Sequence, residues 1–319
     1  MVVFKRIKIV LSIGSMFFFV CYLYPSFFAI DNNRILVTVN NGDSASVVAS
    51  RLKNNGLVFS KKLFLCLVKI TKSQKKIKAG VYSFSKKNNM FEILKKLNIG
   101  LCSVLRFTIP EGSNVKQTAE IISKTVNINK EKFIKIAKDK NMEGYLMPET
   151  YFVTPVVNEE KLIEMMFSEF KKKIKQCMYE RAKEINVDFK NIIIMASIIE
   201  KEAIKSEEKP IIASVFYNRL SKHIKLQSCA TVLYAIERNK SKLTFKDTKF
   251  NSPYNTYMYF GFPPGPICSP GIESIKAALY PANTKNLFFV SDKRGRHLFA
   301  KNFDEHRKNI QSIEILKIK

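Results

Sequence analysis

Two glutamates near the middle of the chain have the setting that acid–base chemistry requires. Glu200 and Glu202 follow a run, residues 192–199, in which nearly every side chain is apolar. Such a run predicts a helix that is buried on all sides. A carboxyl group at the end of a buried helix has a raised pKa unless it is paired, and a raised pKa suits a general acid near neutral pH. These two residues are therefore the candidate catalytic groups.

The two glutamates do not share one face of the predicted helix. Residues two positions apart point about 200° apart around a helix. Glu202 follows Ile198 and Ile199 by one turn, whereas Glu200 follows a serine and an alanine. Glu202 has the more apolar backing and is the first choice, with Glu200 the second. The alternative is a structural ion pair between either carboxylate and a nearby cation: Lys201, Lys205 or Arg219.

Aromatic, amide and hydroxyl side chains gather in the segments that follow the glutamates. Sugars are bound by rings that cover their CH faces and by amides and hydroxyls that bond their OH groups. The Gly- and Pro-rich stretch 261–266 predicts a stiff loop that can wall a groove. Each segment alone also fits ordinary loop chemistry. The candidate substrate-binding residues are Asn218, Gln227, Ser228, Tyr254, Asn255, Thr256 and Tyr257.

A small α+β unit is predicted over residues 31–102. Hydrophobic periodicity and turn residues place a strand over 35–39, helices from 44 and over 62–70, a strand over 79–84 and a helix over 90–97. The order of these elements resembles a LysM-like carbohydrate-binding module.

A larger, mixed and helix-rich domain is predicted over residues 103–319. It begins with a strand over 104–110, continues with helical residues 114–140 and has a shaped loop over 142–151. One long amphipathic helix is predicted over 157–186. The fold class is therefore α+β, with the candidate glutamates inside the larger domain.

The first thirty residues predict a membrane anchor. Lys5, Arg6 and Lys8 precede an uncharged, largely apolar stretch over 9–30. At ~1.5 Å rise per residue this stretch is long enough for the ~30 Å hydrocarbon core of a bilayer. A cleaved signal peptide is the rival interpretation, but no clear small-x-small cleavage site follows the stretch. The basic residues favour a cytoplasmic N-terminus, with the rest of the chain outside the cell membrane.

Charge and cysteine usage exclude some classes of function. Lys and Arg number 54 against 27 acidic residues, a net charge of +27 that fits either an anionic partner or a lysine-rich solvated surface. The predicted membrane span argues against nucleic acid as that partner. Six cysteines form no Cys-x-x-Cys pair, and His297 and His306 lack a short ligand spacing, so we expect no metal site.

Nine motifs follow one another in a characteristic order. They resemble those of the endolytic murein transglycosylase family, the YceG-like lytic transglycosylases, and the resemblance covers nearly the whole chain. The motifs occupy residues 109–112, 143–151, 196–202, 215–220, 226–228, 252–257, 261–267, 270–271 and 295–299.

The resemblance implies an enzyme of the bacterial inner membrane that acts on peptidoglycan. It would cleave the β-1,4 bond between N-acetylmuramic acid and N-acetylglucosamine in nascent glycan strands and leave 1,6-anhydro ends, as a lyase without metal or cofactor. The family's catalytic glutamate maps onto Glu202, as general acid and then base. The resemblance also suggests association with the peptidoglycan synthases of the elongation machinery, and Glu149 lies in a motif expected to contact substrate.

The chain departs from the family pattern at two places. Cys229-Ala230 stands where the family usually has Asp-Pro, and Met147 stands where an aromatic residue is usual. The first departure leaves open a non-catalytic scaffold that binds peptidoglycan. A lysozyme-like hydrolase is a further alternative, which would need a second carboxylate roughly 5–9.5 Å from Glu202. Glu143 and Glu149 are the candidates for that role.

Overall fold

The computed structural model describes residues 34–237, 243–292 and 295–318. The chain divides into two units, one of residues up to 106 with 152–157, the other of 107–151 with the residues from 158 onward. The mixed α+β class that the sequence predicts is confirmed. The predicted membrane span lies outside the described residues. Among the helices that are described, none is both long and apolar enough to cross a bilayer.

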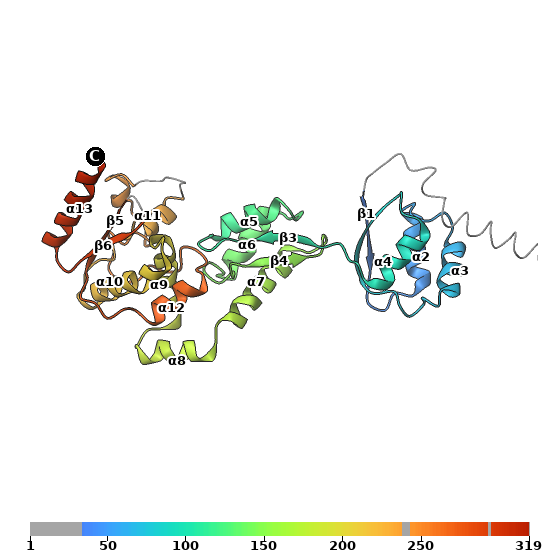
Figure 1. The fold of residues 1–319 in the computed structure, drawn as a ribbon, viewed down its shortest axis with the longest axis horizontal. Coiled ribbons are helices and arrows are strands. Elements are labelled where there is room, and N and C mark those ends of the chain that lie inside the picture. The colour runs from blue at the N-terminus through green and yellow to red at the C-terminus, as the bar shows by residue number, and fades with distance from the viewer. Residues whose placement is uncertain (1–33, 238–242, 293–294, 319) are drawn as a thin grey trace, which may run out of the picture. The chain divides into compact units, whose positions relative to one another are not determined.

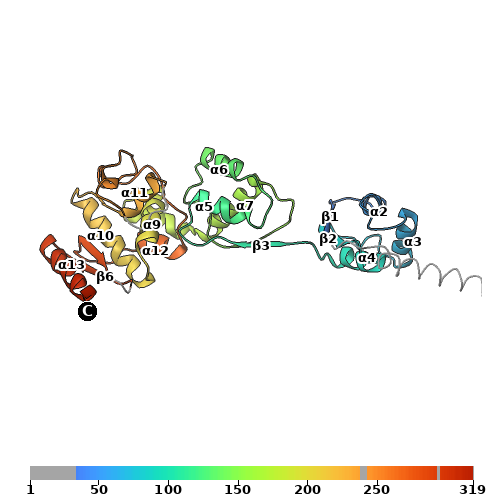
Figure 2. The same ribbon diagram turned by 90° about the horizontal axis from the view of Figure 1, so that it is seen from above.

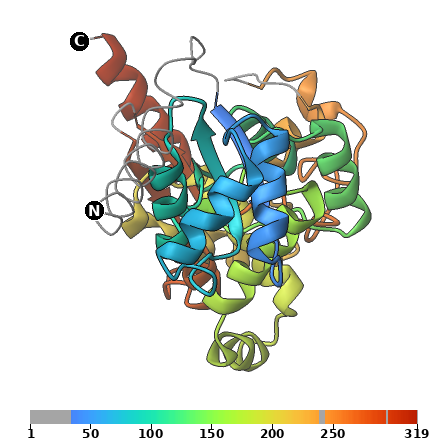
Figure 3. The same cartoon turned by 90° about the vertical axis from the view of Figure 1, so that its right-hand side faces the viewer.

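The first unit is a two-stranded antiparallel sheet with helices on one side of it (Figures 1 and 3). The sequence-based order of strand, two helices, strand and helix is confirmed. Caps define two of the helices: the Ser44 hydroxyl accepts from the Val47 N–H, and Asn89 forms a capping box with Glu92. The elements are β1 (Arg34–Val39), α2 (Ala45–Asn54), α3 (Lys61–Ile70), β2 (Gly80–Ser85) and α4 (Met90–Ile99).

The core of the first unit comes from the inward face of the strand pair and the apolar stripes of the helices. Tyr82 and Phe84 stack with ring centroids 5.9 Å apart, and both are fully buried. Phe64, Leu52 and Ile93 from the three helices are also fully buried. Each large apolar side chain buried in this way contributes roughly 1.5–3 kcal/mol to folding. The unit therefore has a hydrophobic core of its own.

The boundary between the two units falls within the paired strands β3 (Leu105–Thr108) and β4 (Thr150–Val153), of which residues 107–108 and 150–151 belong to the second unit. Two short helices lie between these strands in sequence, α5 (Val115–Ser123) and α6 (Lys130–Asp139). Asn114 forms a capping box with Gln117 at the start of α5, and Asn129 caps α6. The helical stretch predicted over 114–140 is thus two helices separated by a turn.

The prediction of a single long helix over 157–186 is wrong. The structure has two helices there, α7 (Glu159–Lys173) and α8 (Gln176–Glu184). The helix stops at Ile174, which adopts an extended conformation with ψ 109° and is buried in the core of the unit. The apolar side chain turns inward while the flanking lysines stay at the surface. Burial of Ile174 therefore outweighs continuation of the amphipathic pattern.

The remaining elements surround one central helix, α9 (Phe189–Glu202), which lies among α10, α11 and α12 in both Figure 1 and Figure 2. Strands β5 and β6 pair antiparallel beside the C-terminal helix α13. Two short 3-10 turns, η1 (Ser206–Glu208) and η2 (Asp247–Lys249), connect elements. The bounds are α10 Lys209–Ser221, α11 Cys229–Ala235, α12 Ile272–Leu279, β5 Phe288–Ser291, β6 His297–Ala300 and α13 Phe303–Ile318.

We expect Gly144→Ala to destabilise the second unit. Gly144 has φ +84°, and an added Cβ would lie 2.5 Å from Pro266 and 3.2 Å from Ile193. Gly261→Ala is the matched control, because Gly261 has φ +81° and no atom within 4 Å of an added Cβ. Both variants carry backbone strain, but only Gly144→Ala adds a clash, so it should cost about 1–3 kcal/mol more. Chemical denaturation measures the difference, and equal losses in the two variants would contradict the expectation.

Candidate active site

Helix α9 carries both candidate glutamates at its C-terminal end. Asp188 caps its first turn, and residues 192–199 are all buried. The polar side chain within this run is satisfied, because the Ser197 hydroxyl donates to the Ile194 carbonyl at 2.7 Å and accepts from the Ile267 N–H at 3.1 Å. Both carboxyl groups therefore lie at the edge of an apolar core.

Glu200 is fixed by three donors on two other elements. The Lys209 ammonium lies 3.4 Å from its carboxylate, and both side chains are buried. At the start of α12 the Gly271 N–H donates to Glu200 at 2.9 Å and the Ser274 hydroxyl donates at 2.6 Å. A helix N-terminus favours negative charge. Glu200 thus forms the structural ion pair that was the alternative interpretation, although with Lys209 rather than with the cations considered from sequence.

Glu202 lies in a different environment from Glu200. The Ser228 hydroxyl donates to Glu202 Oε1 at 2.5 Å, and the Ala230 N–H donates to the same carboxyl group. Burial is the largest influence and raises the pKa of Glu202 above its ordinary value. The two hydrogen bonds and the charge of His297 lower this pKa only in part. The carboxyl is therefore biased toward its protonated form, as a general acid requires.

The loop that brings Ser228 to Glu202 is held by a buried arginine. The Arg219 guanidinium donates to the Leu226 carbonyl at 2.9 Å and to Gln227 Oε1 at 3.3 Å. Gln227 has φ +51°, an uncommon conformation for a residue with a side chain. The Ser228 N–H in turn donates to Thr256 Oγ1 at 3.0 Å. Arg219 is only 8% exposed, so this loop is fixed by a buried cation.

Two of the predicted sugar-binding residues are used inside the protein. The Asn255 side chain is fully buried and donates to two carbonyls of 248–250, at 3.0 and 2.7 Å. The Asn218 amide donates to two carbonyls of 284–286, at 2.8 and 3.0 Å. In this structure both amides fix loops rather than present donors at the surface.

The other predicted residues surround the Glu202 loop or lie beside it. Thr256 is buried and accepts from Ser228, as described above. The Tyr257 hydroxyl lies 3.2 Å from the Cys229 sulfur, and burial raises the pKa of Tyr257. Tyr254 is partly buried and packs against another tyrosine ring, with centroids 5.0 Å apart. The structure therefore brings Ser228, Thr256 and Tyr257 together around one loop.

The two carboxylates considered as partners of Glu202 have other contacts. Glu149 forms an exposed ion pair with Lys173 at 3.1 Å. Glu143 accepts from the Val115 N–H at 3.2 Å and from the Tyr234 hydroxyl at 3.2 Å. Burial raises the pKa of Glu143 to about 7, although these hydrogen bonds lower it in part. Neither carboxyl is among the groups that shift the pKa of Glu202.

Comparison with known proteins identifies the family. A family model described as the YceG-like family matches residues 37–312, which is more than half of the chain. The chain belongs to the YceG-like family. The family resemblance that the sequence motifs predict is therefore confirmed.

Individual relatives agree with this assignment. The endolytic murein transglycosylase of Bacillus subtilis (strain 168) is 33% identical over 299 residues, which cover 85% of this chain and 82% of that protein. The endolytic murein transglycosylase of Streptococcus pneumoniae (strain ATCC BAA-255 / R6) is 28% identical over 91% of this chain, and the match covers 60% of that longer protein. The crystal structure of the YceG-like protein lmo1499 from Listeria monocytogenes, determined at 2.6 Å, is 33% identical. It superposes with a TM-score of 0.58 over 87% of this chain and 99% of that one.

Sequence reasoning missed two contributors to the site of this YceG-like chain. Glu208 accepts hydrogen bonds from His297, from its backbone N–H at 3.0 Å and its Nδ1 at 2.7 Å, and so fixes a ring whose charge acts on Glu202. The Ala230 donor is a backbone group and leaves no signal in the side-chain pattern. The family motif at residues 295–299 contains His297, but nothing in the sequence indicated its partner 89 residues earlier. Across the described ranges, no three His, Cys, Asp or Glu residues gather as a metal site would require.

We expect Glu143 to make the stability of this protein depend on pH. Its pKa is about 7 in the folded state against an ordinary value of 4.5. Between those values the folded state binds more protons than the unfolded state, so the free energy of unfolding falls as pH rises from 4.5 toward 7. Glu143→Gln removes this term, on the order of 1–3 kcal/mol. Denaturant titrations at pH 5 and pH 8 should show the wild type losing more stability than the variant, while the exposed Glu149→Gln keeps the wild-type difference. Equal losses in the wild type and Glu143→Gln would contradict this assignment.

Proposed function

We propose that this protein is an endolytic peptidoglycan lytic transglycosylase with Glu202 as its general acid and base. The observation that carries the proposal is the environment of Glu202. Its carboxyl ends a buried helix, its pKa is raised by burial, and Ser228 and Ala230 donate to it. The two relatives named above as endolytic murein transglycosylases support the substrate, a glycan strand of peptidoglycan.

The proposed reaction needs one carboxyl group in two successive roles. Protonated Glu202 donates its proton to the glycosidic oxygen between N-acetylmuramic acid and N-acetylglucosamine, and the bond from that oxygen to the muramic C1 breaks. The resulting carboxylate then takes the proton of the muramic C6 hydroxyl, whose oxygen bonds to C1. The products are a 1,6-anhydro end and a free hydroxyl, without consumption of water, and Glu202 is protonated again.

The hydrogen bonds to Glu202 fit the second role as well as the first. When Glu202 has lost its proton, the Ser228 hydroxyl and the Ala230 N–H stabilise the negative charge. Burial keeps the acid protonated beforehand, so the same site favours each form when the reaction needs it. Attack by a hydroxyl of the same sugar is intramolecular, and pre-placed groups of this kind replace a second catalytic residue.

The structure favours this lyase over the two alternatives. A retaining or inverting hydrolase uses a second carboxylate across the groove, but Glu143 is held by Tyr234 and Glu149 by Lys173. A scaffold without activity would have no need of a desolvated carboxyl. The Cys229-Ala230 departure does not remove Glu202 from its donors, because Ala230 is itself one of them.

We infer the rest of the organisation from the sequence. Residues 9–30 anchor the chain in the cell membrane with residues 31–319 outside the cytoplasm. The LysM-like module over 31–102 binds the glycan, and residues 103–319 cut it. The synthases that produce nascent strands during elongation are the expected partners.

Glu202→Gln should abolish strand cleavage without unfolding the protein. Loss of a general acid–base group lowers kcat by about 10²–10⁴-fold. Mass spectrometry of products from isolated uncrosslinked strands measures this, and wild-type products should be lighter than hydrolytic ones by one water. Glu200→Gln is the comparison: it breaks a buried ion pair and should cost about 3–5 kcal/mol of stability while its folded fraction stays active. Products that contain the added water, or full activity in Glu202→Gln, would overturn the mechanism.

Ser228→Ala should shift the pH profile of cleavage. The Ser228 hydroxyl lowers the pKa of Glu202, so its removal leaves that pKa higher and keeps the acid protonated to higher pH. The basic limb of the kcat/KM profile should therefore move to higher pH, while the maximal rate falls because the carboxylate has lost a donor. Ser214→Ala is the control, because Ser214 is also a buried, hydrogen-bonded serine but bonds Ile211 and Thr284. An unmoved basic limb in Ser228→Ala would contradict the role of Glu202.

A further inference from the structure

A short segment of the second unit exposes an unusual number of large apolar side chains. Phe245 is 78% exposed and Phe260 is 65% exposed, and three more side chains between them also face solvent. Folded proteins rarely leave such a group of aromatic residues uncovered unless it binds something. The exposed residues are Phe245, Phe250, Met258, Tyr259 and Phe260.

This segment is folded on itself rather than extended. The fully buried Asn255 donates to the carbonyls of Thr248 and Phe250, and the Tyr259 hydroxyl donates to Asn251 Oδ1 at 2.8 Å. The exposed rings therefore stand on a shaped loop. A platform that is already ordered loses little conformational entropy when it binds.

Lysines accompany the exposed rings. The Lys225 ammonium lies 5.0 Å from the centroid of Phe260, and the Lys249 ammonium lies 4.7 Å from that of Phe245. Within the described part of the chain, neither ammonium forms an ion pair with a carboxylate. We name Lys225, Phe245, Lys249, Tyr259 and Phe260 the aromatic–lysine platform. Its chemistry suits a ligand that has both apolar faces and negative charge.

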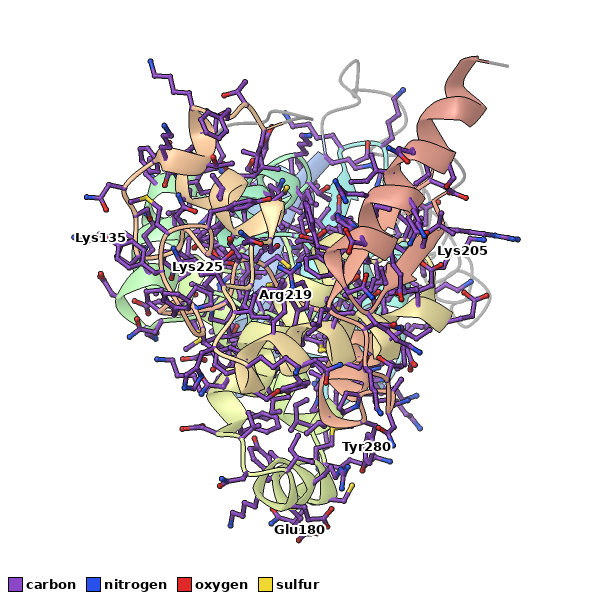
Figure 4. The ribbon with its side chains drawn as sticks, turned by 90° about the vertical axis from the view of Figure 1, so that its left-hand side faces the viewer. Lys135, Glu180, Lys205, Arg219, Lys225 and Tyr280 are labelled. Atoms are coloured by element: carbon purple, nitrogen blue, oxygen red, sulfur yellow. The ribbon has the colours of Figure 1, made fainter. Side chains whose placement is uncertain are left out.

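The segments that bear the platform also bear residues of the Glu202 site. Lys225 lies three residues before Ser228 in the loop that Arg219 holds, and Figure 4 shows Lys225 beside Arg219. The same aromatic segment supplies Tyr257, whose hydroxyl lies 3.2 Å from Cys229. Lys225 and Tyr259 therefore belong to the two segments that also support the loop of Ser228.

We propose that the aromatic–lysine platform binds the peptide stems and adjoining sugars of a glycan strand whose stems are intact. The rings cover sugar CH faces, and Lys225 and Lys249 pair with the carboxylates of the stems. This inference rests on the proposed function and adds to it a preference for strands that carry stems. An anionic lipid surface also has apolar and negative groups, but the segments that bear the platform also support the Glu202 site, which favours the strand.

The test compares two forms of one substrate. Uncrosslinked strands are used either with their stems or after an amidase has removed them, with the full chain in detergent. The wild type should cleave stem-bearing strands with kcat/KM about tenfold higher, a difference that shrinks at high salt because exposed charge pairs are screened. The double variant Lys225→Gln/Lys249→Gln should lose this preference, mainly through KM, with no more than about a twofold change on stripped strands. Phe260→Ser should weaken cleavage of both forms.

The control removes a lysine that lies over an aromatic ring elsewhere on the same unit. Lys171 lies 4.8 Å from the ring of Phe167 on α7, and Lys171→Gln should keep the wild-type preference. Equal cleavage of both strand forms by the wild type, or an unchanged preference in the double variant, would overturn the proposal. The proposal would also be overturned if the double variant cleaved more slowly than the wild type only when the strands are attached to anionic vesicles. That result would assign the platform to lipid binding. Sedimentation with intact strands separates the two hypotheses: tighter binding of stem-bearing strands without cleavage would refute the proposed activity and leave the platform standing.

Discussion

The complete burial of helix α9 is the constraint on which the second unit is built. A helix that is apolar on every face must be enclosed, and here the enclosing elements come from both sides of it in sequence: α8 before it, and α10, α11 and α12 after it. Its one buried serine shows how closely the enclosure is specified. Ser197 is bonded by Ile267 through its hydroxyl, and the Cys268 thiol donates to its carbonyl at 3.3 Å. The residues that follow the Gly- and Pro-rich stretch 261–266 are therefore fixed against α9.

The two carboxyl groups at the end of that helix lie in different environments. Glu200 contacts a lysine ammonium and accepts hydrogen bonds from two neutral donors, and these contacts compensate for its position at the edge of the core. Glu202 receives neutral donors and only the more distant charge of His297, so burial dominates its pKa. Two acids that lie close together in sequence can take different roles when their environments differ in this way. The hydrogen bonds from Gly271 and Ser274 to Glu200 also tie α9 to α12, which steadies the helix that carries Glu202.

Sequence reasoning predicted an apolar environment for Glu202, and the structure buries this carboxyl, because apolar backing is a local property that helical spacing reveals. It also predicted the elements of the first unit, where caps and alternating patterns agree with the final fold. It did not foresee that Lys209 and α12 would hold Glu200, since those contacts depend on how distant segments meet. The two asparagines illustrate a different limit: an amide suits a sugar hydroxyl and a loop carbonyl equally well, and only the buried position of Asn255 distinguishes them. At Ile174 the side chain is buried in the core and the helix ends, so two helices replace the single predicted one.

The departure from the family pattern at Cys229-Ala230 changes the hydrogen bonds of Glu202. Where the family pattern leads one to expect proline, this chain has alanine, and the Ala230 N–H donates to the carboxyl of Glu202. Proline has no N–H and could not make that bond. The substitution thus adds a donor that stabilises the Glu202 carboxylate, at the second residue of α11. The exposed Cys229 thiol lies 3.2 Å from the Tyr257 hydroxyl, so the loop keeps a polar contact at the position where an aspartate is usual. The altered motif changes which groups support Glu202 while leaving the carboxyl buried and hydrogen-bonded.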